Sequence, residues 1–148
     1  MKRGFEIIST YQDQGLSLPK RKTSKSAGYD LQAAETKMIM PKTQAFIPTG
    51  MRAYMMDDEV LILSARSSLF KKKALILSNG VGIIDADYYD NEDNGGHIFI
   101  AVYNMSDHIV TVSKGEAIAQ AMFQKYLLID NDAPENESRK GGFGSTDD

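Results

Sequence analysis

Apolar residues along this chain gather in short runs that are rich in β-branched and aromatic side chains, separated at roughly even intervals by Pro, Gly, Asn and Asp. This pattern is typical of β-strands. No stretch keeps an apolar i, i+3, i+4 spacing for about three turns, although residues 67–73 could form a short helical turn. We predict strands over residues 5–8, 45–47, 52–55, 60–63, 74–77, 98–103, 109–112 and 117–123.

Two of the predicted strands differ in how their faces are used. Residues 98–103 are apolar on both faces, which predicts a strand buried between two layers or at a subunit contact. Residues 109–113 alternate instead, with Val110 and Val112 on one face and Thr111 and Ser113 on the other, so this strand should be half exposed. Together the strands predict an all-β domain, either a sandwich, a barrel or a jelly roll.

The end of the chain has a different character. From about residue 131 onward it carries almost no apolar side chain and cannot contribute to a core. We therefore predict a β domain over residues 1–130 and a flexible C-terminal arm over residues 131–148.

Composition narrows the functional classes. The 148 residues suffice for one domain, and the absence of cysteine excludes disulfides and thiolate metal sites, which favours the cytoplasm. No apolar run approaches the ~18 residues of a membrane span. A net charge of −3 argues against nucleic acid as the main partner, although a local basic pocket is still possible.

Residues 79–88, Asn-Gly-Val-Gly-Ile-Ile-Asp-Ala-Asp-Tyr, are the richest candidate for chemistry. In a straight strand Asp85 and Tyr88 would lie on opposite faces and could not both line one pocket. Gly80 and Gly82 permit a bend. We predict a bent hairpin that holds a reactive acid beside a flat binding surface.

Residues 139–146, Arg-Lys-Gly-Gly-Phe-Gly-Ser-Thr, form a second candidate. The glycines let the backbone approach a ligand, the hydroxyls and N–H groups can cradle an anion, and Phe143 offers a stacking face. The alternative is a flexible glycine tail. Phe143 favours a lid over a triphosphate and a base, since a solvated linker has little reason to expose an aromatic ring.

Three weaker candidates surround these two. Arg66 could bind phosphate bidentately beside Ser67 and Ser68, although a serine pair here could also cap a helical turn. Asp30 follows a glycine by two positions, and Gln120 ends the run Gly-Glu-Ala-Ile-Ala-Gln. Taken singly, these last two could be a turn carboxylate and an ordinary polar group of a strand.

The order of these segments resembles the trimeric dUTPase family, the deoxyuridine triphosphate nucleotidohydrolases. The resemblance spans residues 27–146, and its third and fifth motifs are long and specific. The five motifs are Ala-Gly-Tyr-Asp-Leu at 27–31, Arg-Ser-Ser at 66–68, the run at 79–88, Gly-Glu-Ala-Ile-Ala-Gln at 115–120 and Gly-Gly-Phe-Gly-Ser-Thr at 141–146.

The resemblance implies a distorted jelly roll or β-clip barrel and a homotrimer whose active sites are shared between subunits. It also implies hydrolysis of dUTP to dUMP and pyrophosphate by attack of water on the α-phosphate, with Mg²⁺ bound mainly by the substrate triphosphate. The absence of a dense cage of metal ligands agrees with that mode of binding. Two alternatives are a dCTP deaminase of the same fold and a non-catalytic, dUTP-binding regulatory trimer.

The resemblance also implies roles for individual residues. Asp85 matches the base that activates water, Tyr88 the ring that excludes a 2′-hydroxyl, and Asp30 an acid that approaches the metal through water. Asn79 and the backbone near Ile84 match the hairpin that reads uracil, and Phe143 matches the ring that closes over it. Further substrate contacts are implied for Arg66, Ser67, Ser68, Gly82, Ile83, Gln120, Arg139, Gly144, Ser145 and Thr146.

Some positions depart from the family pattern. The stretch that follows Tyr88, residues 89–96, is longer and more acidic than in the family pattern. Ala117 stands where the family commonly has an arginine. Arg139 is our first choice, and Lys140 our second, for the residue that neutralises the γ-phosphate.

We interpret His97 and His108 as structural or exposed. The basic runs 20–22 and 71–73 are predicted to be solvated, the second of them near enough to Arg66 to raise its local potential.

Overall fold

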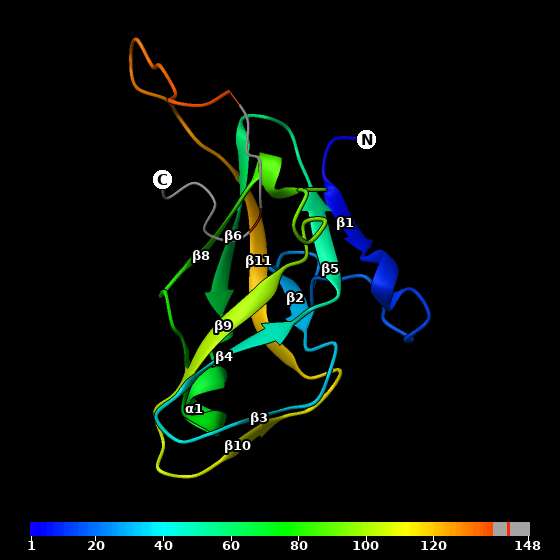
Figure 1. Cartoon of the computed structure of the whole chain (residues 1–148), viewed down its shortest axis with the longest axis vertical. Helices are drawn as coiled ribbons and strands as arrows, with labels where there is room; N and C mark the ends of the chain where they lie inside the picture. The colour runs from blue at the N-terminus through cyan, green and yellow to red at the C-terminus, as the bar shows by residue number, and fades with distance from the viewer. Residues whose placement is uncertain (138–141, 143–148) are drawn as a thin grey trace.

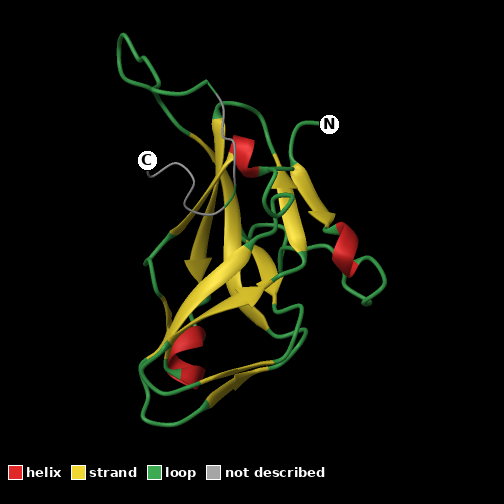
Figure 2. Ribbon diagram, viewed as in Figure 1, coloured by secondary structure: helices red, strands yellow, loops and turns green. Residues whose placement is uncertain are grey.

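The structure is a computed structural model that describes residues 1–137 and residue 142. Within these residues the chain folds into antiparallel strands with very little helix (Figure 2). The elements are β1 (Gly4–Ile7), η1 (Ser9–Tyr11), β2 (Tyr29–Gln32), β3 (Lys37–Ile39), β4 (Gln44–Pro48), β5 (Met51–Tyr54), β6 (Glu59–Ala65), α1 (Leu69–Lys73), β7 (Leu75–Leu77), β8 (Gly82–Asp85), η2 (Ala86–Tyr88), β9 (Phe99–Asn104), β10 (Val110–Val112) and β11 (Ala117–Lys125).

The strands form several small sheets rather than one closed barrel in the described part of the chain. A four-stranded sheet has the order β2-β11-β6-β8, a three-stranded sheet has the order β4-β9-β7, and β1-β5 and β10-β3 are separate pairs. In Figure 1, β1 and β5 lie along one side of the molecule, while α1 and the β3-β10 pair lie at its lower end.

One core joins the two larger sheets. Leu31, Leu61 and Ile84 from the four-stranded sheet belong to the same buried cluster as Ile100 and Val102 from the three-stranded sheet. Alternation of side chains along each strand directs these residues inward. The core therefore holds β2, β6, β8 and β11 in place with their alternate residues facing outward. These outward-facing residues carry most of the candidate site.

Most of the predicted strands are confirmed. Ile100, Ala101 and Val102 are all buried in β9, and Val110 and Val112 are buried on either side of the exposed Thr111. The short helical turn predicted over residues 67–73 is α1. The prediction missed β2 and β3, since each is short and buries only one large apolar residue, Leu31 and Ile39 respectively. It also did not include β8 among the strands, because residues 79–88 were predicted as a bent hairpin.

After β11 the chain leaves the sheets and extends away from them before turning back (Figure 1). Leu127, Leu128 and Ile129 are 96%, 68% and 78% exposed in this single chain. Three consecutive apolar side chains in water are unfavourable, so this stretch is suited to contact with another chain. No helix in the described residues is long and apolar enough to cross a membrane.

Candidate active site

Hydrogen bonding between three strands brings together residues that lie far apart in the sequence. Asp30 in β2 is paired with Gln120 in β11, and Gln120 is paired with Ser64 in β6. Directly opposed residues of antiparallel strands place their side chains on the same face. The acid of the first motif, the amide of the fourth and the strand that leads into the second therefore form one row.

Arg66 extends this row beyond the end of β6. Its Nε lies 3.4 Å from Oδ1 of Asp30, and its Nη1 donates a hydrogen bond of 3.3 Å to the carbonyl of Ala117. The side chains of Arg66 and Asp30 are 26% and 20% exposed, so both groups are held in place yet accessible to a ligand. A guanidinium fixed in this way is well suited to bind phosphate oxygens.

Gly28 explains why the first motif carries a glycine ahead of its acid. A Cβ atom at this position would lie 2.5 Å from Oε1 and 3.0 Å from Cβ of Gln120. Any side chain at position 28 would therefore displace Gln120 from the row.

A small cationic hollow lies beside Arg66. Its volume is about 130 Å³, and it is lined by Arg66, Ser68, Lys72, Lys73 and Glu116, among others. Ser68 occupies the cap position of α1 but makes no capping hydrogen bond with its side chain, so capping does not account for its hydroxyl. The expected proximity of the basic run 71–73 to Arg66 is confirmed by this hollow.

Asp85 lies far from this cationic hollow within one chain. It ends β8, where it is paired with Val60 at the beginning of β6, whereas Arg66 follows the other end of that strand. The rise from Val60 to Ala65 corresponds to about 17 Å at about 3.3 Å per residue. A single chain therefore does not bring the candidate base to the candidate phosphate site.

The turn before Asp85 differs from the predicted bent hairpin. β7 pairs with β9 and β8 pairs with β6, so the turn between β7 and β8 carries the chain from one sheet to the other. Gly80 has φ of 72°, as the prediction requires for a turn. Gly82 instead lies inside β8, where a Cβ atom would approach Cβ of Leu63 to 2.9 Å, so its role is close packing.

The change of face between Asp85 and Tyr88 comes from η2 rather than from the glycines. This 3-10 turn starts directly after Asp85 and ends the period-two alternation. Asp85 is exposed, whereas Tyr88 belongs to the core cluster and is 5% exposed. The Tyr88 hydroxyl donates to the carbonyl of His97 at 2.7 Å and accepts from Nδ2 of Asn94 at 2.9 Å, so the ring is firmly held.

The residues proposed to read a base line a narrow cavity. Asn79, Gly82, Ile83 and Ile84 border a space of about 40 Å³ together with residues of β9. Ile83 is 56% exposed and points its apolar surface to the outside of this single chain.

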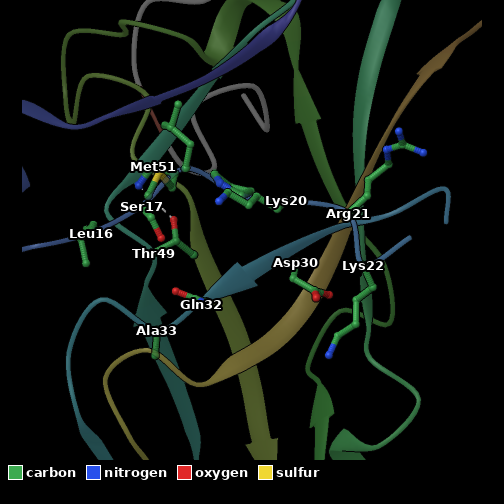
Figure 3. Close-up of a pocket in the computed structure, with 12 residues that line it drawn as sticks. Leu16, Ser17, Lys20, Arg21, Lys22, Asp30, Gln32, Ala33, Thr49 and Met51 are labelled. Atoms are coloured by element: carbon green, nitrogen blue, oxygen red, sulfur yellow. Dashed lines mark hydrogen bonds between the residues drawn. The ribbon is translucent and has the colours of Figure 1, made fainter. Parts of the chain in front are cut away.

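A larger cavity also borders Asp30 (Figure 3). Its volume is about 320 Å³, and Lys20, Arg21 and Lys22 line it. All three are exposed, in agreement with the solvated charge run predicted there. Nη1 of Arg21 donates to the carbonyls of Ser24 and Ser26, so this guanidinium braces its own loop. Sequence reasoning missed this basic rim because the bridge that joins Arg21 to Tyr29 has no local signal.

Several predicted residues lie outside the described part of the chain. These are Arg139, Lys140, Phe143, Gly144, Ser145 and Thr146. Gly142 is described, and it is buried. No group of three or more His, Cys, Asp or Glu side chains that could hold a metal ion occurs among residues 1–137 and 142.

His97 is a structural residue, in agreement with its interpretation from sequence. It is 7% exposed, its ring lies 4.2 Å from that of Phe99, and its Nε2 accepts a hydrogen bond of 2.9 Å from the backbone N–H of Gly50. Nε2 must be unprotonated to accept that bond. Burial lowers the pKa of His97 below its usual 6.5, while the charge of Glu35 opposes that shift.

Stability should therefore decline on mild acidification. In the unfolded chain His97 gains a proton as pH falls through about 6.5, whereas in the folded chain its lowered pKa keeps it neutral, so the unfolded state is favoured. For one proton the slope is at most about 1.4 kcal/mol per pH unit. Urea unfolding at fixed protein concentration between about pH 7 and 5 should show a shallower slope for His97→Gln.

His108→Gln is the matched control, because His108 is exposed. This variant should keep the slope of the unaltered protein. An unchanged slope in His97→Gln would show that His97 is not the group whose protonation destabilises the fold.

Comparison with known proteins gives a consistent result. The dUTPase family model matches residues 14–147. The deoxyuridine 5′-triphosphate nucleotidohydrolase of Lactococcus lactis subsp. lactis is 49% identical over 145 residues, 97% of this chain and 97% of that protein. The enzyme of the same name from Legionella pneumophila strain Paris is 33% identical over 149 residues, 96% of this chain and 94% of the relative.

Solved structures agree with the fold. The crystal structure of dUTPase from Streptococcus mutans superposes with a TM-score of 0.83 at 49% identity, covering 86% of this chain and 99% of that one. A mutant dUTPase from phage phi11 of S. aureus, in which a structural Mg(II) ion is coordinated, has a TM-score of 0.72 at 21% identity, covering 93% of this chain and 99% of that one. At that identity the likeness concerns the fold alone.

Proposed function

The chain belongs to the dUTPase family, and from that premise we propose that it hydrolyses dUTP to dUMP and pyrophosphate. The observation that carries the proposal is the row formed by Asp30, Gln120 and Arg66, which joins three separate motifs on one face of the sheet. Such a reaction limits the uracil that enters DNA and supplies dUMP. The absence of cysteine supports a cytoplasmic location.

The phosphate chain is proposed to bind along that row and in the cationic hollow beside it. Arg66 would contact phosphate oxygens, and the hydroxyls of Ser67 and Ser68 would donate to them. Lys72 and Lys73 line the same hollow and raise its potential for an anion, although Lys73 already pairs with Glu116 at 3.3 Å. The amide of Gln120 completes the contacts from β11.

The active site is proposed to be shared between subunits of a homotrimer. About 17 Å of β6, from Val60 beside Asp85 to Ala65 before Arg66, separates the two residues in one chain. Chemistry requires base and phosphate to be within hydrogen-bond reach through at most one water. A neighbouring subunit that supplies Asp85 would close this gap. The exposed Ile83 beside Asp85 and the exposed run 127–129 are suited to such contacts.

Asp85 is proposed as the general base. Its carboxylate would take a proton from a water molecule while the oxygen of that water forms a bond to the α-phosphorus. The bond from the α-phosphorus to the bridging oxygen then breaks, so pyrophosphate leaves and dUMP retains the new oxygen. Exposure of Asp85 at the end of β8 makes its carboxylate accessible to that water.

Mg²⁺ is the proposed cofactor. Asp30 is a partly exposed carboxylate on the phosphate row, which fits a contact through water, and the substrate oxygens would supply the direct ligands. When bound, the ion would neutralise charge on the triphosphate. Asp30 pairs with Arg66 at 3.4 Å, and this pairing would hold the carboxylate in place for that contact.

Base selection is proposed to involve Asn79 and the backbone of Gly82, Ile83 and Ile84. Hydrogen bonds to uracil would reject cytosine, because the wrong edge leaves buried groups unpaired. Rejection of thymine would need a tight wall instead, which the narrow cavity at these residues supports. Tyr88 is proposed to exclude a 2′-hydroxyl, and residues 131–148 to act as an arm whose Arg139, Phe143, Gly144, Ser145 and Thr146 contact substrate.

A panel of nucleotides tests the substrate. Purified protein with Mg²⁺ should release pyrophosphate from dUTP, and discrimination against dCTP should reach about 10⁴–10⁵. UTP and dTTP should also be poor substrates. Release of ammonia from dCTP would identify a deaminase, and tight binding of dUTP without turnover would identify a regulatory nucleotide-binding trimer.

A further inference from the structure

The acidic stretch that follows Tyr88 is an ordered loop, defined here as the post-tyrosine loop, residues 90–96. Oδ1 of Asn91 accepts hydrogen bonds from the backbone N–H of Asp93 at 3.0 Å and of Asn94 at 3.1 Å. The backbone N–H of Asp90 donates to the carbonyl of Gly95 at 3.1 Å and closes the loop. The loop is therefore held by its own side chains.

The outer side of this loop is tied to the β1-β5 pair. Nη1 of Arg52 donates to Oδ1 of Asp90 at 3.1 Å, and the Arg52 guanidinium lies 4.5 Å from the ring centroid of Tyr89. The Tyr89 hydroxyl donates to Oε1 of Glu6 at 2.6 Å. Asp90 is thus part of a charge network that anchors the loop.

Two asparagines of the loop hold Tyr88 through hydrogen bonds. Nδ2 of Asn91 donates to the Tyr88 carbonyl at 2.7 Å, and Nδ2 of Asn94 donates to the Tyr88 hydroxyl at 2.9 Å. A shift of the loop would therefore move the ring proposed to face the sugar.

A third contact links the loop to the terminal glycine motif. Oδ2 of Asp93 accepts a hydrogen bond of 2.7 Å from the backbone N–H of Gly142. A Cβ atom at position 142 would lie 3.0 Å from Oδ1 of Asn91 and 3.3 Å from Nδ2 of Asn94. The loop therefore packs closely against Gly142 and leaves little room for a side chain at that position.

The hydrogen bond between Gly142 and Asp93 has a charged acceptor. A charge-assisted hydrogen bond to a backbone N–H is about twice as strong as a neutral one. We propose that Asp93 is a positioning residue, which binds the backbone of Gly142 and so holds this glycine against the loop that fixes Tyr88. The effect of Asp93 on catalysis rests on the proposed function.

Limited proteolysis tests the contact without reference to catalysis. Trypsin sites at Arg139 and Lys140 directly precede Gly141 and Gly142 in the sequence, so release of the terminal peptide reports how often the contact between Gly142 and Asp93 is broken. Without nucleotide, Asp93→Ala should be cleaved there about tenfold faster, as expected for loss of a hydrogen bond to a charged group. Asp93→Asn, which keeps a carbonyl acceptor, should fall between Asp93→Ala and the unaltered protein.

Glu92→Ala is the matched control, since it removes the same charge from the neighbouring exposed position of the same loop. It should be cleaved at the rate of the unaltered protein, and dUTP turnover should follow the same order, with kcat/KM about tenfold lower in Asp93→Ala alone. Equal cleavage of Asp93→Ala and the unaltered protein, or equal acceleration in Glu92→Ala, would overturn the proposal. Failure of the unaltered protein to hydrolyse dUTP would instead contradict the proposed function and leave the cleavage comparison valid.

Discussion

Asp85→Asn is expected to reduce the turnover of dUTP on the order of 10²–10⁴-fold. The amide that replaces the carboxylate has nearly the same shape, but it cannot take a proton from water. Asp85 is exposed at the end of β8 and contributes no side chain to the core, so the variant should fold normally. Steady-state rates of pyrophosphate release at saturating dUTP measure the effect.

Asp87→Asn is the matched control for this variant. Asp87 is an exposed acid in η2, two positions further along the chain, so the change removes the same charge. It should reduce kcat much less than Asp85→Asn if the effect depends on proton transfer rather than on charge. Turnover near that of the unaltered protein in Asp85→Asn would remove Asp85 from the role of base.

Deletion of residues 139–148 is expected to leave a folded trimer with turnover reduced on the order of 10²-fold. Residues 1–137 already contain the sheets and their shared core, so the deleted segment is not needed for folding. Its glycine motif is proposed to enclose the substrate, and loss of enclosure slows chemistry through poor positioning. Light scattering gives the mass of the assembly, and pyrophosphate release gives the rate.

A shorter deletion of residues 147–148 provides the control. It removes two aspartates that follow the glycine motif and leaves that motif complete. This variant should turn over at least as fast as the full chain, because two negative charges near a phosphate site are lost. A monomeric product of the longer deletion would show that the arm holds the trimer together, and unchanged turnover would show that it does not enclose the substrate.

Strands with a strong apolar pattern were predicted better than short strands that contain few buried apolar residues. β9 was predicted because its apolar residues occupy both faces, and β10 because Val110 and Val112 alternate with polar residues. β3 contains only Lys37, Met38 and Ile39, and it forms because β10 offers it a partner. Pairing between distant segments overrides a weak local preference and leaves no local signal.

The candidate site was predictable as a set of motifs but not as a geometry. Order and spacing pointed to Asp30, Arg66 and Gln120, and the register of β2, β11 and β6 places them in one row. The separation of Asp85 from Arg66 depends on which strands pair, as does the basic rim at residues 20–22. The hydrogen bond between Asp93 and Gly142 joins residues far apart in the sequence, and only the fold brings them together.

Hydrolysis of dUTP in oxygen-18 water, with mass spectrometry of both products, tests the central claim most directly. If water activated by Asp85 attacks the α-phosphorus, dUMP and pyrophosphate should form in equal amounts and the label should appear in dUMP alone. Label in pyrophosphate would place the attack on a different phosphorus. An absence of both products would contradict the assignment of this chain as a dUTP pyrophosphohydrolase.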